Sequence, residues 1–249
     1  MKLFSSEVGH NYDSYTFGYV QYCIRESGDT LGEIYNAGYL PYSGASGVQD
    51  IFYMARSARI LLPQFTFTSE NRRIAKKFDG QFEKERIAFK KFNRTKEFID
   101  FCLAYFSSRH GTSVMPRERL EFILDSNLIS NTMIYHSKNK PVAYALEVGE
   151  GAIGHYWYSF FDPSLAHQSL GLWLMQDAIL DAQKRRLSHY YLGTVYGEKA
   201  LYKTNFKSLE WWDGSAWNTD IKLLKERSRS DSERIISIKD IWKEGQTLF

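Results

Sequence analysis

Residues 152–193 read AIGHYWYSFFDPSLAHQSLGLWLMQDAILDAQKRRLSHYYLG, and this stretch decides the fold. The run over 152–162 is aromatic throughout and predicts a β-strand. The next apolar residues recur at three- and four-residue steps and predict a helix of about four turns, with the stripe Leu172, Met175, Ile179 and Ala182. A second strand follows from His189. Strand, helix and strand in this order predict a crossover between parallel strands, which is right-handed in nearly all proteins.

The preceding segments extend this sheet. Two runs with strand character, 131–137 and 140–149, are joined by a turn signal at 138–140. An amphipathic pattern over 89–106 predicts a helix, and Pro116 is placed in the first turn of another. The elements after residue 89 therefore run helix, helix, strand, strand, strand, helix, strand, which predicts an α/β acyltransferase-like fold.

The first part of the chain carries mostly β-strand signals. A strand over 15–24 is followed by a short helix that ends at Gly38, and a β-rich stretch over 50–68 is interrupted by Pro63. Ser69 is placed to cap a basic helix that reads SENRRIAKKF. The predicted division is a β-rich region with the start of this helix over 1–80, and an acyltransferase domain over 81–249.

The composition is that of a folded, enzyme-sized protein. Of the 249 residues 43% are apolar and 24% are charged, close to the averages for globular domains, which excludes a disordered chain. Cys23 and Cys102 are the only cysteines, so we expect neither a metal site of paired cysteines nor a disulfide framework. The start lacks a signal peptide's apolar core, and no run reaches the roughly 18 apolar residues of a membrane span. We therefore expect a cytoplasmic protein that does not enter a membrane.

Positive charge is concentrated in one segment. The formal net charge is only +3, yet residues 69–96 contain ten Lys or Arg against four acidic residues. Local charge of this kind favours a polyanion-binding surface, because phosphate attraction depends on the nearby cations. The alternative is a solvated helix with internal ion pairs such as Glu83 with Arg86.

The loop before the long helix resembles a coenzyme A site in part. In the N-acetyltransferase superfamily this loop has the form QxxGxG or QxxGxA, and its amides hold the pyrophosphate of coenzyme A. Here it reads Gln168-Ser169-Leu170-Gly171-Leu172-Trp173, so the first two positions match. Trp173 stands where a small residue is needed, and its indole would obstruct the close approach of a phosphate. The other acyl donor that suits this fold is the 3′ end of an aminoacyl-tRNA.

Two segments carry a resemblance to a known family. Residues 158–193 and the stretch ALYKTNFKSLEWW at 200–212 resemble the C-terminal half of arginyl-tRNA–protein transferases and of their bacterial leucyl-transferring relatives. The stretches IYNAGYLPYSG and ARSARILLPQFTFTSENRRIAKK are similar to the family's N-terminal part. The resemblance extends from about Leu31 to Trp212. Its implied fold is an N-acetyltransferase-like mixed sheet with flanking helices.

This sequence departs from the family pattern in four places. The family's N-terminal cysteine pairs and its mid-domain cysteine are absent, so no metal or cluster function is carried over. The family's Tyr-Asp-Pro is Phe161-Asp162-Pro163 here. The gap between Leu-Gly and Tyr-Lys is two residues shorter, and the turn at 38–41 lacks the family's arginines. The choice of substrate therefore stays open.

The resemblance implies an enzyme, an aminoacyl-tRNA-dependent protein transferase. It would add arginine, or leucine, to the N-terminal amine of an acceptor protein and so create an N-degron. The implied partners are the aminoacyl-tRNA, as co-substrate, and the acceptor N-terminus, with no separate cofactor and with the oligomeric state open. A coenzyme A-dependent N-acetyltransferase is the alternative activity, and a binding module without catalysis is the third interpretation.

The resemblance and the residue chemistry together give the candidate site residues. The catalytic candidates are Asp162, Tyr202 and Lys203. Substrate binding is assigned to Gln168, Ser169, Gly171, Trp173, Tyr191 and Lys199. Contacts with tRNA phosphates are assigned to Arg56, Arg59, Arg72, Arg73, Lys76 and Lys77.

Each candidate has a structural alternative. Asp162 is equally a turn former, Tyr202 a core residue, Lys203 a surface charge and Ser169 a helix cap. His155 and His167 are the candidate bases, with a structural role as the alternative. Backbone amides between Ser159 and Asp162 are a further hypothesis, because a strand that leaves its neighbour frees amides that could polarise an ester carbonyl.

Overall fold

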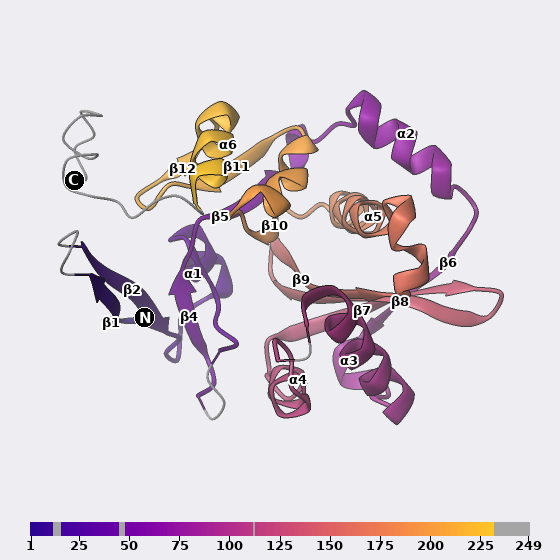
Figure 1. Ribbon diagram of the computed structural model, residues 1–249, viewed down its shortest axis with the longest axis horizontal. Helices are drawn as coiled ribbons and strands as arrows, with labels where there is room; N and C mark the ends of the chain where they lie inside the picture. The colour runs from indigo at the N-terminus through magenta and orange to yellow at the C-terminus, as the bar shows by residue number, and fades with distance from the viewer. Residues whose placement is uncertain (12–15, 45–47, 112, 232–249) are drawn as a thin grey trace.

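The computed structural model describes residues 1–11, 16–44, 48–111 and 113–231 (Figure 1). The helices are α1 (Leu31–Asn36), α2 (Ser69–Phe78), α3 (Lys96–His110), α4 (Arg117–Leu124), α5 (Leu170–Lys184) and α6 (Ile221–Ser230). The short 3-10 helices are η1 (Leu62–Gln64), η2 (Phe89–Lys91), η3 (Pro163–Gln168) and η4 (Glu198–Asn205).

The strands form two sheets. The smaller sheet has the order β1-β2-β4-β3, from β1 (Lys2–Asn11), β2 (Thr16–Ile24), β3 (Tyr39–Pro41) and β4 (Ile51–Met54). The larger sheet has the order β12-β11-β5-β10-β9-β8-β7-β6. Its strands are β5 (Ser57–Leu61), β6 (Glu83–Ala88), β7 (Ile129–Ser137), β8 (Lys140–Glu150), β9 (Ile153–Phe161), β10 (His189–Thr194), β11 (Leu209–Trp212) and β12 (Trp217–Asn218).

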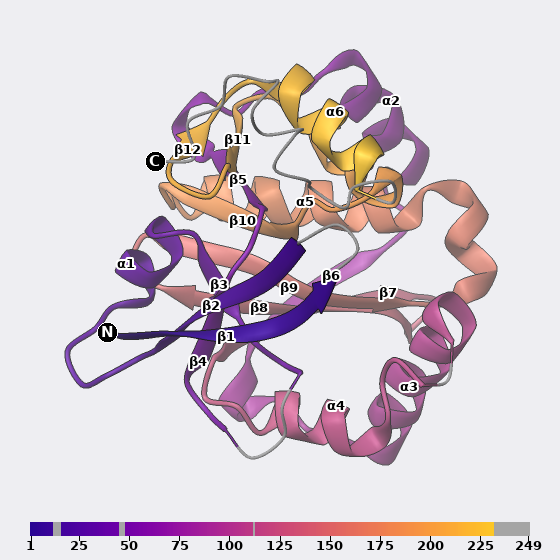
Figure 2. The ribbon, with the colours of Figure 1, turned by 60° about the vertical axis from the view of Figure 1, so that its left-hand side comes forward.

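The predicted crossover is confirmed. Strand β9, helix α5 and strand β10 follow one another, and β9 and β10 pair in parallel. The whole predicted order is also present, as α3, α4, β7, β8, β9, α5 and β10. Helix α5 covers one face of the larger sheet, and α3 and α4 lie on the other face (Figures 1 and 2). The expected mixed sheet with flanking helices, the N-acetyltransferase-like architecture, is therefore confirmed.

The larger sheet contains one buried carboxylate that joins its layers. Glu147 lies at a bulge in β8 and is 1% exposed. It accepts hydrogen bonds from Arg86 on β6 at 2.9 Å and from Arg185 at the end of α5 at 2.9 Å and 3.0 Å. The hydroxyl of Tyr190 on β10 also donates to it, at 3.3 Å. A buried charge is tolerated when it is paired and hydrogen-bonded in this way.

The structure corrects two predictions about helix starts. The basic helix is capped by Thr68, whose side chain accepts from the amide of Asn71, and Ser69 is the first helical residue. The helix expected over 89–106 begins only at Lys96, because Thr95 caps it and residues 89–91 form a 3-10 turn. In both cases a neighbouring threonine supplies the oxygen that satisfies the first amides of the helix.

The basic segment is not a single helix. It is divided among α2, the edge strand β6 and η2. Half of its cations form ion pairs. Arg73 and Lys96 pair with acids within the same helix, and three pair with acids in distant segments: Lys84, Arg86 and Arg94. The division at residue 80 stays a prediction; β5, which precedes it, is hydrogen-bonded between β10 and β11.

The structure also locates the two cysteines. Cys23 and Cys102 are buried free thiols. Within the described ranges, no three His, Cys, Asp or Glu side chains are grouped as metal ligands would be. Among the same residues, no helix combines the length and the apolar character needed to cross a bilayer.

Replacing Gly154 with alanine tests the packing of the crossover. A Cβ at Gly154 would lie 2.8 Å from Cε2 of Tyr190, a fully buried ring. We expect Gly154→Ala to lower the free energy of unfolding by about 1–3 kcal/mol, because the ring has no space to move into. Urea unfolding followed by circular dichroism measures the change.

Gly32→Ala is the matched control, since the nearest atom to a Cβ there is 3.8 Å away. We expect it to leave stability unchanged or to raise it slightly, as alanine favours a helix. Equal stability of Gly154→Ala and wild type would contradict the packing described here.

Candidate active site

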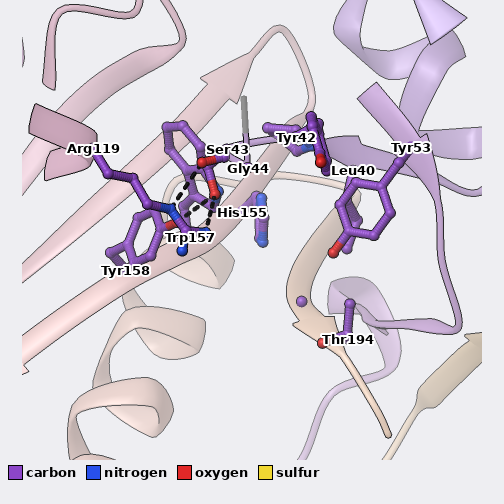
Figure 3. A pocket seen from close by; sticks show the side chains of 12 residues that line it. Leu40, Tyr42, Ser43, Gly44, Tyr53, Arg119, His155, Trp157, Tyr158 and Thr194 are labelled. Atoms are coloured by element: carbon purple, nitrogen blue, oxygen red, sulfur yellow. Dashed lines mark hydrogen bonds between the residues drawn. The ribbon is translucent and has the colours of Figure 1, made fainter. Parts of the chain in front are cut away.

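The candidate site lies where β9 and β10 separate. Their parallel ladder contains three residue pairs and ends with Tyr191 opposite His155. After that point β9 remains paired with β8, whereas β10 remains paired with β5. A cavity of about 380 Å³ opens beside the separation, lined by Leu40, Pro41, Tyr42, Ser43, Gly44, Tyr53, Arg119, His155, Trp157, Tyr158, Gly193 and Thr194 (Figure 3).

Gly193 allows β10 to turn away from β9. It has a φ of +81°, a left-handed conformation that favours glycine, and the register with β5 shifts between Tyr191 and Gly193. A Cβ at this position would lie 3.6 Å from Nζ of Lys203 and 3.7 Å from Nε2 of His155. The lysine and the histidine therefore approach the same point on the wall of the cavity.

His155 is held as a neutral imidazole. It is 2% exposed, and burial, with a smaller contribution from Lys203, lowers its pKa to about 3. Its Nδ1 lies 2.9 Å from the hydroxyl of Tyr35, which is fully buried on α1. That hydroxyl has no other acceptor among the described residues, so we assign it as the donor to Nδ1. Nε2 then carries the proton, and in the described part of the chain this nitrogen has no hydrogen-bond partner.

Lys203 is a buried cation beside this imidazole. It lies on η4, is 9% exposed and donates from Nζ to the carbonyl oxygen of Thr194 at 2.7 Å. Burial lowers the pKa of Lys203 to about 8. Among the described residues no carboxylate forms an ion pair with it. The Tyr- and Lys-rich turn after β10 thus folds back and places an amine at the point where the strands separate.

Arg119 and a pair of hydroxyls form another part of the wall. Arg119 on α4 donates from Nε to the carbonyl oxygen of Ser43 at 2.9 Å and from Nη2 to its Oγ at 3.1 Å. Its Nη1 donates to the carbonyl oxygen of Val114 at 2.8 Å, and Oγ of Ser43 lies 2.9 Å from the hydroxyl of Tyr158. Figure 3 shows Arg119, Ser43 and Tyr158 together on one side, across from Tyr53 and Thr194.

The predicted catalytic residues occupy different places. Lys203 lies behind the cavity lining, where its Nζ approaches Gly193, a lining residue. Neighbouring Tyr202 is 40% exposed, with its ring centroid 5.9 Å from Nζ of Lys203. Asp162 lies beyond the far end of β9, where Oδ1 accepts from the amide of Ser164 at 2.9 Å. Its own amide donates to the carbonyl oxygen of Val142, so it is not free to polarise an ester. Asp162 therefore forms the turn that follows β9.

The predicted substrate-binding residues are mostly outside the cavity lining. Trp173 packs against Phe78, Phe82 and Tyr135, with centroid distances between 5.3 Å and 5.5 Å. Tyr191 has no exposed surface, and Lys199 is exposed on η4. The side chain of Gln168 lies outside the described residues, as does that of the candidate base His167. Gly171 is close to Phe161, since a Cβ there would lie 3.1 Å from its ring.

The loop before α5 corrects the expected cap. Ser169 stands at the predicted N-cap position of α5, but it has a φ of +67° and its side chain makes no capping hydrogen bond. The amides of Leu172 and Trp173 both donate to the carbonyl oxygen of Ser169, at 3.2 Å and 3.1 Å. Two of the amides that would hold a pyrophosphate are thus already bonded within the first turn.

Of the six predicted phosphate-binding residues, two are bonded to other side chains of the protein, and four lie on α2. Arg59 is 6% exposed and bonds to Glu210, Asn36 and Tyr191, so it is part of the core. Arg56 donates to both carboxylate oxygens of Asp231 and lies over the ring of Tyr196. The other four lie on α2: Arg72, Arg73, Lys76 and Lys77. Helix α2 lies beyond α5 from strands β3 and β4, which line the cavity (Figures 1 and 2).

Sequence reasoning missed three residues of the site: Tyr35, Ser43 and Arg119. Tyr35 and His155 are 120 positions apart, and Arg119 and Ser43 are 76 apart. No local motif signals such contacts. The position of Arg119 early in a helix after a proline gave no indication of its direction. Only the pairing of the two sheets and the docking of α4 bring these side chains together.

The mixed sheet with flanking helices and the separated parallel strands give the chain an N-acetyltransferase-like fold. Residues 97–213 match the family model described as arginine-tRNA-protein transferase, C terminus. The resemblance in the motifs is therefore confirmed for this part of the chain, which is similar to the C-terminal part of that family. The match includes Arg119, His155, Gly193 and Lys203.

Curated relatives agree with this family. An aspartate/glutamate leucyltransferase of Sinorhizobium medicae is 44% identical over 62 residues, 24% of this chain and 24% of the relative. The leucyltransferase of Cereibacter sphaeroides is 28% identical, over 65% of this chain and 60% of the relative. That of Alcanivorax borkumensis is 29% identical, over 64% of this chain and 67% of the relative. The chain thus spans about a quarter of the first relative and less than two thirds of the second.

Solved structures with a similar arrangement include FemX, with a TM-score of 0.43 and 12% identity over 66% of this chain and 59% of that chain. A GCN5-related glucosamine N-acetyltransferase region from a fungal multi-domain protein has a TM-score of 0.42 and 8% identity. It covers 84% of this chain and 24% of the other.

Burial of Lys203 predicts a pH dependence of stability. An unfolded lysine holds its proton up to about pH 10.5, whereas folded Lys203 releases it near pH 8. The unfolded state binds more protons between these values, so the free energy of unfolding rises with pH there, by up to about 3 kcal/mol. We expect Lys203→Met to lose this rise.

Urea unfolding of wild type and variant between about pH 8 and about pH 10 measures the difference. Exposed Lys207 supplies the control, Lys207→Met, which should follow the wild type. Parallel pH profiles for wild type and Lys203→Met would show that Lys203 titrates as an ordinary lysine.

Proposed function

We propose that this protein transfers an aminoacyl group, leucine or arginine, from an aminoacyl-tRNA to the N-terminal amine of an acceptor protein. The observation that carries the proposal is that Nε2 of His155 and Nζ of Lys203 both approach Gly193, which lines the cavity. These three residues lie in the segment that matches the family model. The names of the curated relatives support the same reaction class and acceptors that begin with aspartate or glutamate.

The reaction needs little chemical assistance beyond position and one proton acceptor. An aminoacyl ester is already activated, and an N-terminal ammonium has a pKa of about 7.7–8.0. Lys203, with its pKa near 8, is matched to such an amine, so a proton can pass between the two groups at low cost. Its hydrogen bond to the carbonyl oxygen of Thr194 holds Nζ in place.

The proposed steps balance without a further reactant. The acceptor nitrogen attacks the ester carbonyl and forms the new C–N bond, and its proton passes to neutral Lys203. The bond from carbon to the ribose oxygen then breaks, and Lys203 returns the proton to that oxygen. Nε2–H of His155, which has no partner within the described residues, is placed to donate to the negatively charged oxygen of the intermediate.

The cavity favours leucine over arginine. None of the described residues in its lining is an aspartate or a glutamate, whereas a guanidinium that leaves water needs an anionic partner. Leu40, Pro41, Tyr53 and Trp157 supply apolar surface that suits a leucyl side chain. Arginine remains the second substrate to be tested.

Coenzyme A is the alternative acyl donor. The bonded amides of Leu172 and Trp173, and the aromatic cluster that surrounds the indole of Trp173, leave the usual pyrophosphate seat less suited to it. Acetyl transfer to the same acceptor peptide, with acetyl coenzyme A in place of charged tRNA, tests this activity. Acetylation without aminoacylation would overturn the proposal.

Transfer of radiolabelled amino acid to a peptide from leucyl-tRNA and from arginyl-tRNA tests the proposed function. We expect transfer whose rate rises with pH to a plateau above about pH 8, as Lys203 loses its proton. Lys203→Arg, which stays protonated, should lower the rate by about 100-fold or more. Lys207→Met is the control that should retain wild-type transfer. Absence of transfer from either charged tRNA, with folded protein, would contradict the proposal.

A further inference from the structure

We propose that Arg119 is the residue that selects an acidic first residue in the acceptor, by binding its side-chain carboxylate inside the cavity. This inference rests on the proposed function for the identity of the ligand. The arrangement behind it is independent of the reaction: a guanidinium in a cavity wall, fixed by three hydrogen bonds and without an anion beside it.

The oxygens that bind Arg119 are all uncharged. They are the carbonyl oxygens of Ser43 and Val114, the Oγ of Ser43 and the hydroxyl of Tyr158. No described carboxylate lies within ion-pair distance of this guanidinium, although arginines elsewhere in the described chain, such as Arg117 and Arg59, are ion-paired. A partly buried cation that lacks a counter-ion attracts an anionic ligand, because the ligand supplies the missing charge.

The guanidinium retains donors for such a ligand. It carries five N–H groups, and three donate to Ser43 and Val114, one each on Nε, Nη1 and Nη2. The guanidinium also interacts with the hydroxyl of Tyr158. At least one N–H is then left to donate to a carboxylate oxygen of a ligand. The hydroxyls of Ser43 and Tyr158, 2.9 Å apart, complete a polar corner beside it.

The position of this corner fits the acceptor. Arg119 and His155 line the same cavity of about 380 Å³, whose far wall is formed by Tyr53 and Thr194 (Figure 3). The α-amine and the side-chain carboxylate of one aspartate or glutamate are only a few bonds apart, so both ends fit one cavity of this size. A tRNA phosphate is the competing anion, but phosphate sites commonly gather several cations. Among the lining residues that the structure describes, Arg119 is the only arginine or lysine.

Direct binding of peptides without tRNA tests the inference separately from transfer. Two fluorescent peptides that differ only in an N-terminal aspartate or asparagine are titrated with wild-type protein, and binding is followed by anisotropy. We expect the aspartyl peptide to bind about 10-fold or more tightly, as a charge-assisted hydrogen-bonded pair would give. Arg119→Met should reduce this ratio to near one, and Arg119→Lys should retain part of it.

Arg117→Met is the matched control, since Arg117 lies on the same helix but pairs with Asp100 and Glu121 outside the cavity. It should keep the wild-type ratio. Thermal unfolding of each variant shows whether the cavity wall is intact, and Arg119→Lys carries the comparison if Arg119→Met does not fold. An unchanged ratio in folded Arg119→Met, or no preference in wild type, overturns the inference. Weaker tRNA binding by Arg119→Met with an unchanged peptide ratio would assign Arg119 to a phosphate instead.

The two proposals fail in different ways. If the protein prefers the aspartyl peptide through Arg119 but transfers no amino acid, the specificity site is supported and the proposed transfer reaction is contradicted. If the protein transfers leucine or arginine equally well to aspartyl and asparaginyl peptides, the transfer reaction is supported and the role of Arg119 in specificity is contradicted.

Discussion

The separation of β9 from β10 after three parallel pairs is the constraint on which the rest of the site depends. A sheet that stayed paired would use its amides and carbonyls in the ladder and leave no room for a ligand. Here Gly193, in a left-handed conformation, lets β10 continue along β5 while β9 continues along β8. The carbonyl oxygen of Thr194 is thereby free to hold Lys203.

The chemistry of the site follows from what burial does to two basic groups. Burial favours the neutral form of each, which leaves His155 neutral over the physiological range and brings the pKa of Lys203 close to that of an N-terminal amine. Neither group has a carboxylate partner among the described residues. Burying such groups costs stability, as is common at functional sites, and the proposed reaction would use one side chain to take up a proton and the other to donate to an oxygen.

The sequence predicted the parts that depend on local periodicity. The crossover of β9, α5 and β10 was predicted because the apolar steps of its helix are regular and strand signals stand on both sides of it. Lys203 was named as a candidate through the family resemblance of the segment that follows β10. Arg59 shows the limit of counting charges along a chain. It was predicted to bind phosphate, yet it pairs with Glu210, 151 positions away, and lies over the ring of Trp217. Only the tertiary structure tells which cations are neutralised by distant acids.

The placement of β5 has a consequence for how the protein is made. This strand is synthesised early, but it lies between β10 and β11, which emerge from the ribosome more than a hundred residues later. The larger sheet cannot close, and Arg59 on β5 cannot meet Glu210 on β11, until almost the whole described chain is available. Contacts of such long sequence separation make folding slow and leave β5 an unpaired strand in the nascent chain. The larger sheet is thus completed only when synthesis has reached its last strands.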